Sequence, residues 1–297
     1  MVTNRSRGDR IFDIINTIIM VFIILITLYP FWYCIIGSFN EGLDYMRGGV
    51  YLWPRKFSLN NYRIVLSDRA ILHAYIITIA RTIIGTVLTL LVTALFAYAF
   101  SRDYLMGRNI YAALGIITMY FSGGMIPTYL TIKMLGLLDN FWVYILPGLF
   151  GFYNALIFNA FFKGIPQSLF DSAKIDGAGE YRVFFNIVIP LSTPVLATIA
   201  LFVAVGHWNS YFDAMLYTTK EELQPIQLYL MKIIRTKAAA AQKAQAGAAS
   251  LHIEQNAVTS TTMQYATMMI TIIPIIIVYP FLQKYFVKGL LIGSIKG

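Results

Sequence analysis

Residues 71–100 read ILHAYIITIARTIIGTVLTLLVTALFAYAF, and this stretch decides the fold class. Thirty residues of α-helix rise about 45 Å, which exceeds the ~30 Å of hydrocarbon at the centre of a bilayer. The stretch contains no acidic residue, and its basic side chains are His73 and Arg81. It therefore predicts a helix that crosses a membrane.

Similar apolar runs fill most of the 297 residues. The hydrophobic fraction is 58%, the charged fraction is 12%, and the mean hydropathy is +0.66. A soluble domain usually has roughly 25% charged residues. The sequence therefore predicts one all-α integral membrane domain with six transmembrane helices, at residues 11–36, 71–100, 110–132, 141–162, 183–212 and 263–287.

Six crossings put both termini on one side of the membrane. The N-terminal side and the opposite side each carry eleven Lys and Arg residues, but on the N-terminal side they lie in short segments beside helix ends. That density favours the cytoplasm for both termini. The first run is too long for a signal-peptide core, so we expect it to be retained. The predicted organisation is a cytoplasmic N-terminus 1–10, a first helix 11–36, an outer loop 37–70, a core transmembrane domain 71–287 with an outer loop 213–262, and a cytoplasmic tail 288–297.

Charge and cysteine content exclude several classes. The formal charge of +9 is scattered without a basic stripe, which favours a lipid surface over a nucleic acid. Cys34 is the single cysteine, so an intrachain disulfide is impossible. His73, His207 and His252 lie far apart in the sequence and have no cysteine neighbours, so we expect no metal site.

The polar segment between the fourth and fifth helices has a distinctive pattern. Pro166 suits a helix start and Gly177 a helix end, which predicts a short surface helix at about 166–181. The segment reads Asp171-Ser172-Ala173, three residues, Gly177, nine residues, Ile187, one residue, Ile189-Pro190.

This pattern resembles the signature loop of binding-protein-dependent ABC importer permeases. That loop reads Glu-Ala-Ala, three residues, Gly, nine residues, Ile, one residue, Leu-Pro. The spacing is complete, with conservative changes at Asp171, Ser172 and Ile189. The resemblance implies the type I ABC importer permease architecture and a cytoplasmic coupling helix that docks on an ATPase subunit. We expect Ala173 and Gly177 to allow close approach, and the coupling residues to be Asp171, Ser172, Ala173, Gly177, Ile187 and Pro190.

Other segments resemble the carbohydrate branch, in particular the smaller maltose-type permease and the LplC-type polysaccharide permeases. They are residues 58–62, 97–102, 127–129, 135–137, 208–209 and the C-terminal end. The resemblance implies import of oligosaccharides, including acidic ones with uronate groups, across the bacterial cytoplasmic membrane. It also implies a second homologous permease, an extracytoplasmic solute-binding protein and two ATPase subunits that bind ATP and Mg, against which Lys288 and Lys296 of the tail would lie. This chain needs no cofactor.

Polar groups within the spans are candidates for the substrate pathway. Arg81 lies about 15 Å from the outer end of its helix, where it either meets the sugar, snorkels outward or binds backbone carbonyls. Tyr120 precedes a Ser-Gly-Gly break that suits either a cavity or a packing kink. Trp208, Asn209 and Tyr211 combine aromatic and amide groups, as a sugar site does, although an interfacial belt would also use the aromatic residues.

Two other function classes are less consistent with the sequence. A secondary transporter or channel would show similar halves or intramembrane carboxylates for ion coupling, and neither is visible. A membrane-embedded enzyme would show a catalytic motif within a span, and we find none. The chain also lacks a Gly-Lys dipeptide and thus a phosphate-binding loop, so ATP hydrolysis must take place on separate subunits.

Overall fold

The computed structural model describes residues 7–245 and 260–294, with side chains at 8–235 and 261–280. Within those ranges the regular structure is helical, apart from one antiparallel bridge between Asn40 and Phe57. The described residues divide into two compact units. The first lies within residues 1–68 and 232–272, and the second lies within residues 69–231 and 273–297.

The first unit contains α1, α2 and α3 and is held together around one asparagine. The Asn61 amide donates to the carbonyls of Ser38 (2.8 Å) and Asn40 (2.9 Å), and the Thr262 hydroxyl donates to its Oδ1 (3.0 Å). This side chain thereby joins the end of α1 to α3 and to α14. The bounds are α1 Arg7–Ser38, α2 Gly42–Met46, α3 Asn60–Ser67 and, shared with the second unit, α13 Ile226–Gln245 and α14 Ser260–Ser294.

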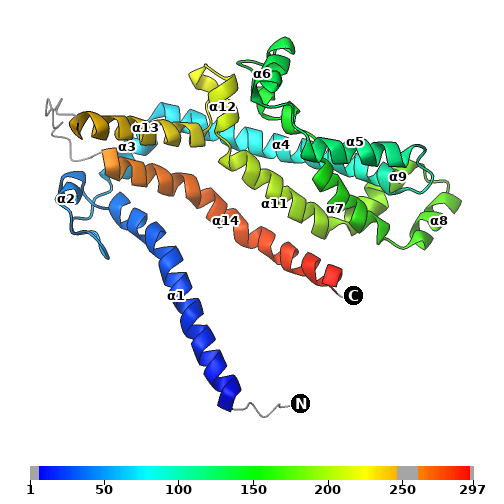
Figure 1. Ribbon diagram of the computed structural model, residues 1–297, viewed down its shortest axis with the longest axis horizontal. Helices are drawn as coiled ribbons and strands as arrows, with labels where there is room; N and C mark the ends of the chain where they lie inside the picture. Colours follow the sequence, from blue (N-terminus) through cyan, green and yellow to red (C-terminus); the bar gives the residue numbers. More distant parts are fainter. Residues whose placement is uncertain (1–6, 246–259, 295–297) are drawn as a thin grey trace. The chain divides into compact units, whose positions relative to one another are not determined.

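The second unit is organised around α4, which packs against α7 and α11 (Figure 1). Its main apolar core includes Ala97 of α4, Phe158 of α7 and Ile199 of α11. The bounds are α4 Arg69–Ser101, α5 Arg108–Tyr120, α6 Met125–Met134, η1 Phe141–Tyr144, η2 Leu146–Gly148, α7 Phe152–Lys163, α8 Gln167–Ile175, α9 Glu180–Val183, the π-helical turn η3 Phe184–Val188, α10 Ile189–Leu191, α11 Thr193–Asn209, α12 Phe212–Tyr217 and η4 Glu221–Leu223.

Three of the six predicted spans are bent rather than continuous. The long helices at Gly8–Ser38, Arg69–Ser101 and Thr261–Pro280 are apolar enough to cross a membrane without interruption. The other three spans are helix pairs bent by 114° between α5 and α6, 54° between η2 and α7, and 82° between α10 and α11. Glycine and proline at the breaks account for this, since they interrupt the helical hydrogen bonds. The sequence had indicated only the α5–α6 break.

The surface helix in the polar segment is shorter than predicted. It ends at Ile175 rather than near residue 181, because Gly177 has a left-handed φ of 73°. The N–H of Ala178 donates to the carbonyl of Ala173 (2.9 Å) and closes a glycine-based helix cap. The chain then starts a separate turn, α9. The Ala-rich run 237–250 continues α13 as far as Gln245, and its remainder lies outside the described residues.

Candidate functional site

In the middle of α4, between residues 78 and 93, the packed face is mostly polar, whereas the exposed face of the helix is apolar. Thr78, Arg81 and Thr89 are buried, whereas Ile76 and Ile83 are about 60% exposed. A helix of a water-soluble protein shows the opposite pattern, but lipid is as apolar as a protein core and accepts an apolar outer face. The polar groups of α4 therefore point into the second unit.

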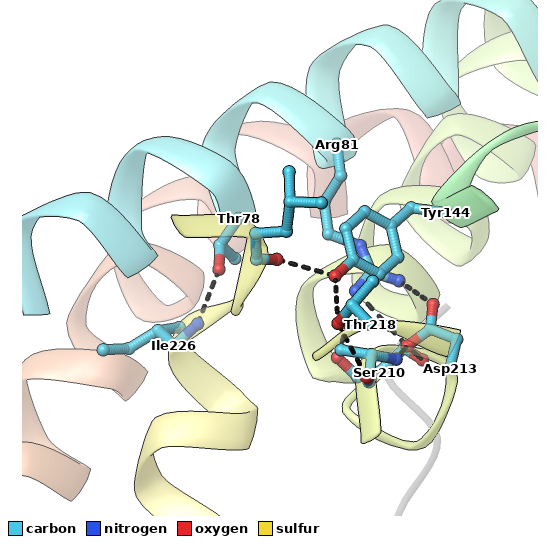
Figure 2. Close-up of polar contacts among 9 residues, drawn as sticks. Thr78, Arg81, Tyr144, Ser210, Asp213, Thr218 and Ile226 are labelled. Carbon is cyan, nitrogen blue, oxygen red and sulfur yellow. Dashed lines mark hydrogen bonds and ion pairs between the residues drawn. The ribbon is translucent and has the colours of Figure 1, made fainter. Parts of the chain in front are cut away.

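Arg81 is matched by a carboxylate from α12 (Figure 2). Its Nη2 donates to Asp213 Oδ2 at 2.5 Å, and its Nη1 lies 3.3 Å from the Ser210 carbonyl and 3.4 Å from Asp213 Oδ1. The Arg81 side chain is 1% exposed and that of Asp213 is 23% exposed. Because a buried guanidinium needs both charge and hydrogen-bond compensation, Asp213 is the group that allows Arg81 to lie at this depth.

Tyr144 completes what we call the Arg81 cluster, namely Arg81, Asp213, Ser210 and Tyr144. The guanidinium carbon lies 4.5 Å from the centre of the Tyr144 ring, within cation–π range. The Tyr144 hydroxyl donates to the Leu223 carbonyl at 2.6 Å, and Ser210 Oγ donates to Asp213 Oδ1 at 2.9 Å. The cluster thus joins α4, η1, α12 and η4 through an ion pair, hydrogen bonds and a cation–π contact.

The sequence had shown no acidic partner for Arg81 within a span. Asp213 lies 132 positions away and follows the fifth predicted span, in a segment that we had assigned to the outer loop. One alternative interpretation of Arg81, binding to backbone carbonyls, is realised in part by Ser210. A single carboxylate in the otherwise apolar stretch 211–217 was the available signal, but its sequence position alone does not identify the arginine that it pairs with.

A cavity of about 530 Å³ adjoins this cluster, and we call it the Arg81 cavity. Its volume lies within the range typical of ligand sites. The bend at η2–α7 contributes backbone at Gly148 and Gly151 to the wall. Gly85 leaves room for the His207 ring, because a Cβ at position 85 would lie 2.4 Å from its Nε2. The polar side chains along the wall are those of Arg81, Thr89, Tyr144, Asn154, His207, Ser210, Asp213 and Tyr217.

Among the predicted pathway residues, only Arg81 lines this cavity. Tyr120 is 85% exposed at the α5–α6 break, and Trp208 is buried with its ring 6.3 Å from that of Tyr75. Asn209 accepts a 3.4 Å hydrogen bond from Gln227. Tyr211 packs on a second apolar cluster around Val143 and Ala214. Their role in transport stays a prediction, whereas Asn154 and His207 are lining residues that sequence reasoning missed.

The six predicted coupling residues lie in and after α8. Asp171 and Ser172 are exposed, and Asp171 accepts a hydrogen bond from Gln167 at 3.1 Å. Ala173 is buried in the core of its own unit together with Phe170, and its role in the approach of a partner stays a prediction. A Cβ at Gly177 would meet no atom within 4 Å, and the special property of this residue is its left-handed φ. Ile187 is half-buried and Pro190 is exposed, and both follow the turn at α9.

A second, half-buried arginine fixes α8 to the end of α4. The Arg102 guanidinium lies 3.6 Å from the ring centre of Phe170 and 4.4 Å from that of Tyr98. Glu180 accepts hydrogen bonds from the hydroxyls of Tyr98 (2.5 Å) and Tyr104 (2.7 Å). Burial, and then the hydrogen bond to Glu180, raise the pKa of Tyr104 to about 12. We call these five residues the Arg102 cluster, and it holds α8, α9 and α4 together.

Asp139 joins the loops near the Arg81 cavity. Its carboxylate accepts from the backbone N–H and the hydroxyl of Thr219, at 2.5 and 2.8 Å, and from the N–H of Lys220 at 3.1 Å. These bonds, led by the Thr219 backbone, lower the pKa of Asp139 below its usual value. Asp139 thereby fixes the chain that follows Tyr217, whose side chain lines the cavity.

The two predicted tail contacts lie outside the described side chains. Lys288 belongs to α14, but its side chain is not among those described, and Lys296 lies beyond the described residues.

Comparison with known proteins relates nearly the whole chain to permeases. The protein LplC of Bacillus subtilis is 39% identical over 294 residues, which cover 99% of this chain and 98% of that protein. The polygalacturonan/rhamnogalacturonan transport system permease protein YtcP of Bacillus subtilis is 40% identical over 290 residues, which cover 97% and 99%. No family model matches the chain.

A solved structure agrees with these relatives. A chain in the crystal structure of a bacterial ABC transporter involved in the import of the acidic polysaccharide alginate superposes with a TM-score of 0.86 and 34% identity, covering 95% of this chain and 99% of that one. The all-helical fold, the apolar spans and the near-complete alignments agree. This protein is a transport subunit rather than an enzyme, and it belongs to the family of integral membrane permease subunits of ABC sugar importers.

Proposed function

We propose that this chain is one of two permease subunits of a type I importer that moves acidic, uronate-containing oligosaccharides into a bacterial cell. The observation that supports this most is the full-length similarity to YtcP and to the alginate importer chain, whose names denote acidic polysaccharides. A second homologous permease, an extracytoplasmic binding protein and two ATPase subunits with ATP and Mg complete the complex.

The proposed coupling surface is the exposed side of α8. Phe170 and Ala173 face the core, which leaves Leu169 (40% exposed), Asp171 and Ile175 (86% exposed) available to an ATPase subunit. Two apolar side chains around a carboxylate suit a groove that contains a basic group. Since the Arg102 cluster fixes α8 to α4, force applied at this surface reaches the helix that carries Arg81.

The proposed topology has six spans, counting each bent pair as one, with both termini and α8 in the cytoplasm. The experiment is labelling of a single cysteine at Ser294 with a membrane-impermeant maleimide, in a Cys34→Ser background. Labelling in inverted vesicles but not in intact cells is expected. Labelling from outside intact cells contradicts this orientation and removes the tail, with Lys288 and Lys296, from the ATPase side.

Substrate and coupling are tested on the complete complex in proteoliposomes. We expect the cognate binding protein loaded with oligogalacturonate to stimulate ATP hydrolysis and uptake more than when it is offered a neutral oligosaccharide. Equal stimulation by neutral and acidic sugars contradicts the acidic substrate but leaves the importer assignment intact. Absence of uptake with every sugar in the panel contradicts the importer function.

A further inference from the structure

Two residues that line the Arg81 cavity each have a buried polar atom without a hydrogen-bond partner. The atoms are Nε of Arg81, a donor, and Oγ1 of Thr89, which can donate and accept. Their side chains are 1% and 3% exposed. A buried polar group without a partner costs roughly 1–3 kcal/mol, so two of them on one cavity wall point to a ligand that supplies hydrogen bonds.

An unpartnered hydroxyl by itself does not define a site, because Thr93 of the same helix also has one. Thr93 is fully buried and does not line the cavity. What distinguishes Thr89 is its place on a wall that also includes Arg81, the Asn154 amide and the His207 imidazole. These groups provide both donors and acceptors, which is the requirement for binding hydroxyl groups.

The charge of the wall excludes a carboxylate as the preferred ligand. The formally charged residues along it are Arg81 and Asp213, and they form an ion pair. Arg81 therefore offers no free positive charge, and the partly exposed carboxylate of Asp213 would repel a second carboxylate. Phe202 and Tyr217 add aromatic surface, which suits the apolar face of a sugar ring.

We propose that the Arg81 cavity binds the hydroxyl groups of a sugar ring in the transported saccharide and does not bind its carboxylate. This rests on the proposed function and deepens it, because it places substrate contact in this subunit and assigns recognition of the acidic group to another part of the complex. Thr89 Oγ1 and Arg81 Nε are the contacting atoms.

The test compares Thr89→Val with Thr93→Val in the complete complex. Both changes replace a buried hydroxyl on α4 by a methyl group of similar size, one at the cavity and one away from it. Uptake is measured for oligogalacturonate and for its methyl ester, and ATP hydrolysis is measured in parallel. The affinity of the binding protein for each saccharide is determined separately, so that delivery is accounted for.

Thr89→Val should lower uptake per ATP about three- to ten-fold, the effect of one lost hydrogen bond, and equally for both saccharides. Thr89→Ser, which keeps the hydroxyl, should restore most of the uptake, and Thr93→Val should behave like the wild type. Thermal unfolding of each variant complex shows whether the variant is folded. A loss of uptake in a complex of normal stability then reports a lost contact rather than a folding defect.

Three outcomes overturn the inference while the importer function stands. They are wild-type uptake by Thr89→Val, an equal loss in Thr93→Val, and a loss confined to the free acid, which would mean that the cavity reads the carboxylate. A wild-type complex that takes up neither saccharide overturns the proposed function, and the inference with it.

Discussion

One buried arginine lies within α4 and a half-buried one directly follows it, and the two are stabilised in different ways. Arg81 is paired with the carboxylate of Asp213, whereas Arg102 lies between the rings of Phe170 and Tyr98. The two residues are 21 positions apart, or about 30 Å along the helix. The first arrangement borders a polar cavity, and the second holds a surface helix in place.

The two arrangements differ in the mutations that they tolerate. An ion pair leaves an uncompensated buried charge when one partner is lost, so its members depend on each other. When Arg102 is removed, its two ring partners are neutral and Glu180 keeps its hydrogen bonds from Tyr98 and Tyr104. We therefore expect mutations in the Arg81 cluster to cost more stability than mutations in the Arg102 cluster.

The largest effect is expected from Asp213→Asn. Without the carboxylate, the Arg81 guanidinium remains buried and charged, and the oxygens that remain near it are the Ser210 carbonyl and the new amide. The complex should lose about 2–3 kcal/mol of stability, which is less than the ~3–5 kcal/mol typical of a broken buried pair because Asp213 is partly exposed. Thermal unfolding of the purified complex in detergent measures this loss.

The matched control removes both charges. Arg81→Met combined with Asp213→Asn should recover at least half of the lost stability, since no buried charge is left without a partner. If the double variant is as unstable as Asp213→Asn, the loss of stability comes from packing rather than from an unpaired charge. The proposed difference between the two clusters is then wrong.

A smaller effect is expected from Arg102→Met, which keeps most of the apolar stem. The two ring contacts are worth about 1–2 kcal/mol together. Glu180 keeps its two tyrosine hydrogen bonds, so no buried carboxylate is left unsatisfied. We expect a modest loss of stability with a clear loss of ATPase stimulation by the binding protein, because α8 is no longer fixed to α4.

Arg108→Met is the control for this change. Arg108 lies 5.3 Å from the Phe100 ring and 3.5 Å from the exposed Asp103, contacts that contribute little in water. Its replacement should leave both stability and ATPase stimulation near wild-type values. If Arg102→Met and Arg108→Met have equal effects, a positive charge anywhere in this region supports coupling, and the specific ring contacts of Arg102 do not.

Gly177→Asp tests whether the cap of α8, next to the Arg102 cluster, is needed for coupling. A side chain at φ 73° costs about 1 kcal/mol, which should distort the cap of α8 and uncouple ATP hydrolysis from uptake. Gly179→Asp adds the same charge two positions later, where φ is −73°, and should leave coupling intact. Gly177→Asn should be tolerated better than Gly177→Asp, since asparagine accepts left-handed backbone. Normal coupling in Gly177→Asp would contradict the role of this cap.

The smallest expected effect is a pH dependence of the loop that Asp139 fixes near the Arg81 cavity. The folded pKa of Asp139 is lowered, so its stabilising contribution is complete above the unfolded value of roughly 4 and is lost as pH falls through the folded pKa. Hydrogen exchange at the Thr219 and Lys220 amides should accelerate in that acidic window. In Asp139→Asn, these two amides should exchange faster at neutral pH, and their exchange should no longer depend on acid in this way. An unchanged exchange profile would show that Asp139 does not fix this segment.

Prediction from the sequence succeeded where the signal is local. The long apolar runs indicated the helices, and the spacing from Asp171 to Pro190 indicated the family that the relatives support. Two of the three helix breaks were missed because glycine and proline are common in membrane helices and do not always bend them. The sequence did not indicate that Ala173 is buried in the core, because a small residue fits both a docking surface and a packed core.

The apolar helices and the polar loop of a known pattern could be predicted from the sequence, because hydropathy and motif spacing depend only on neighbouring residues. Three contacts became visible only in the folded chain: Asp213 neutralises Arg81, Thr89 and Asn154 share a cavity wall, and Arg102 holds α8. These contacts join segments far apart in the chain, and the packing that brings them together leaves no periodic trace in the sequence.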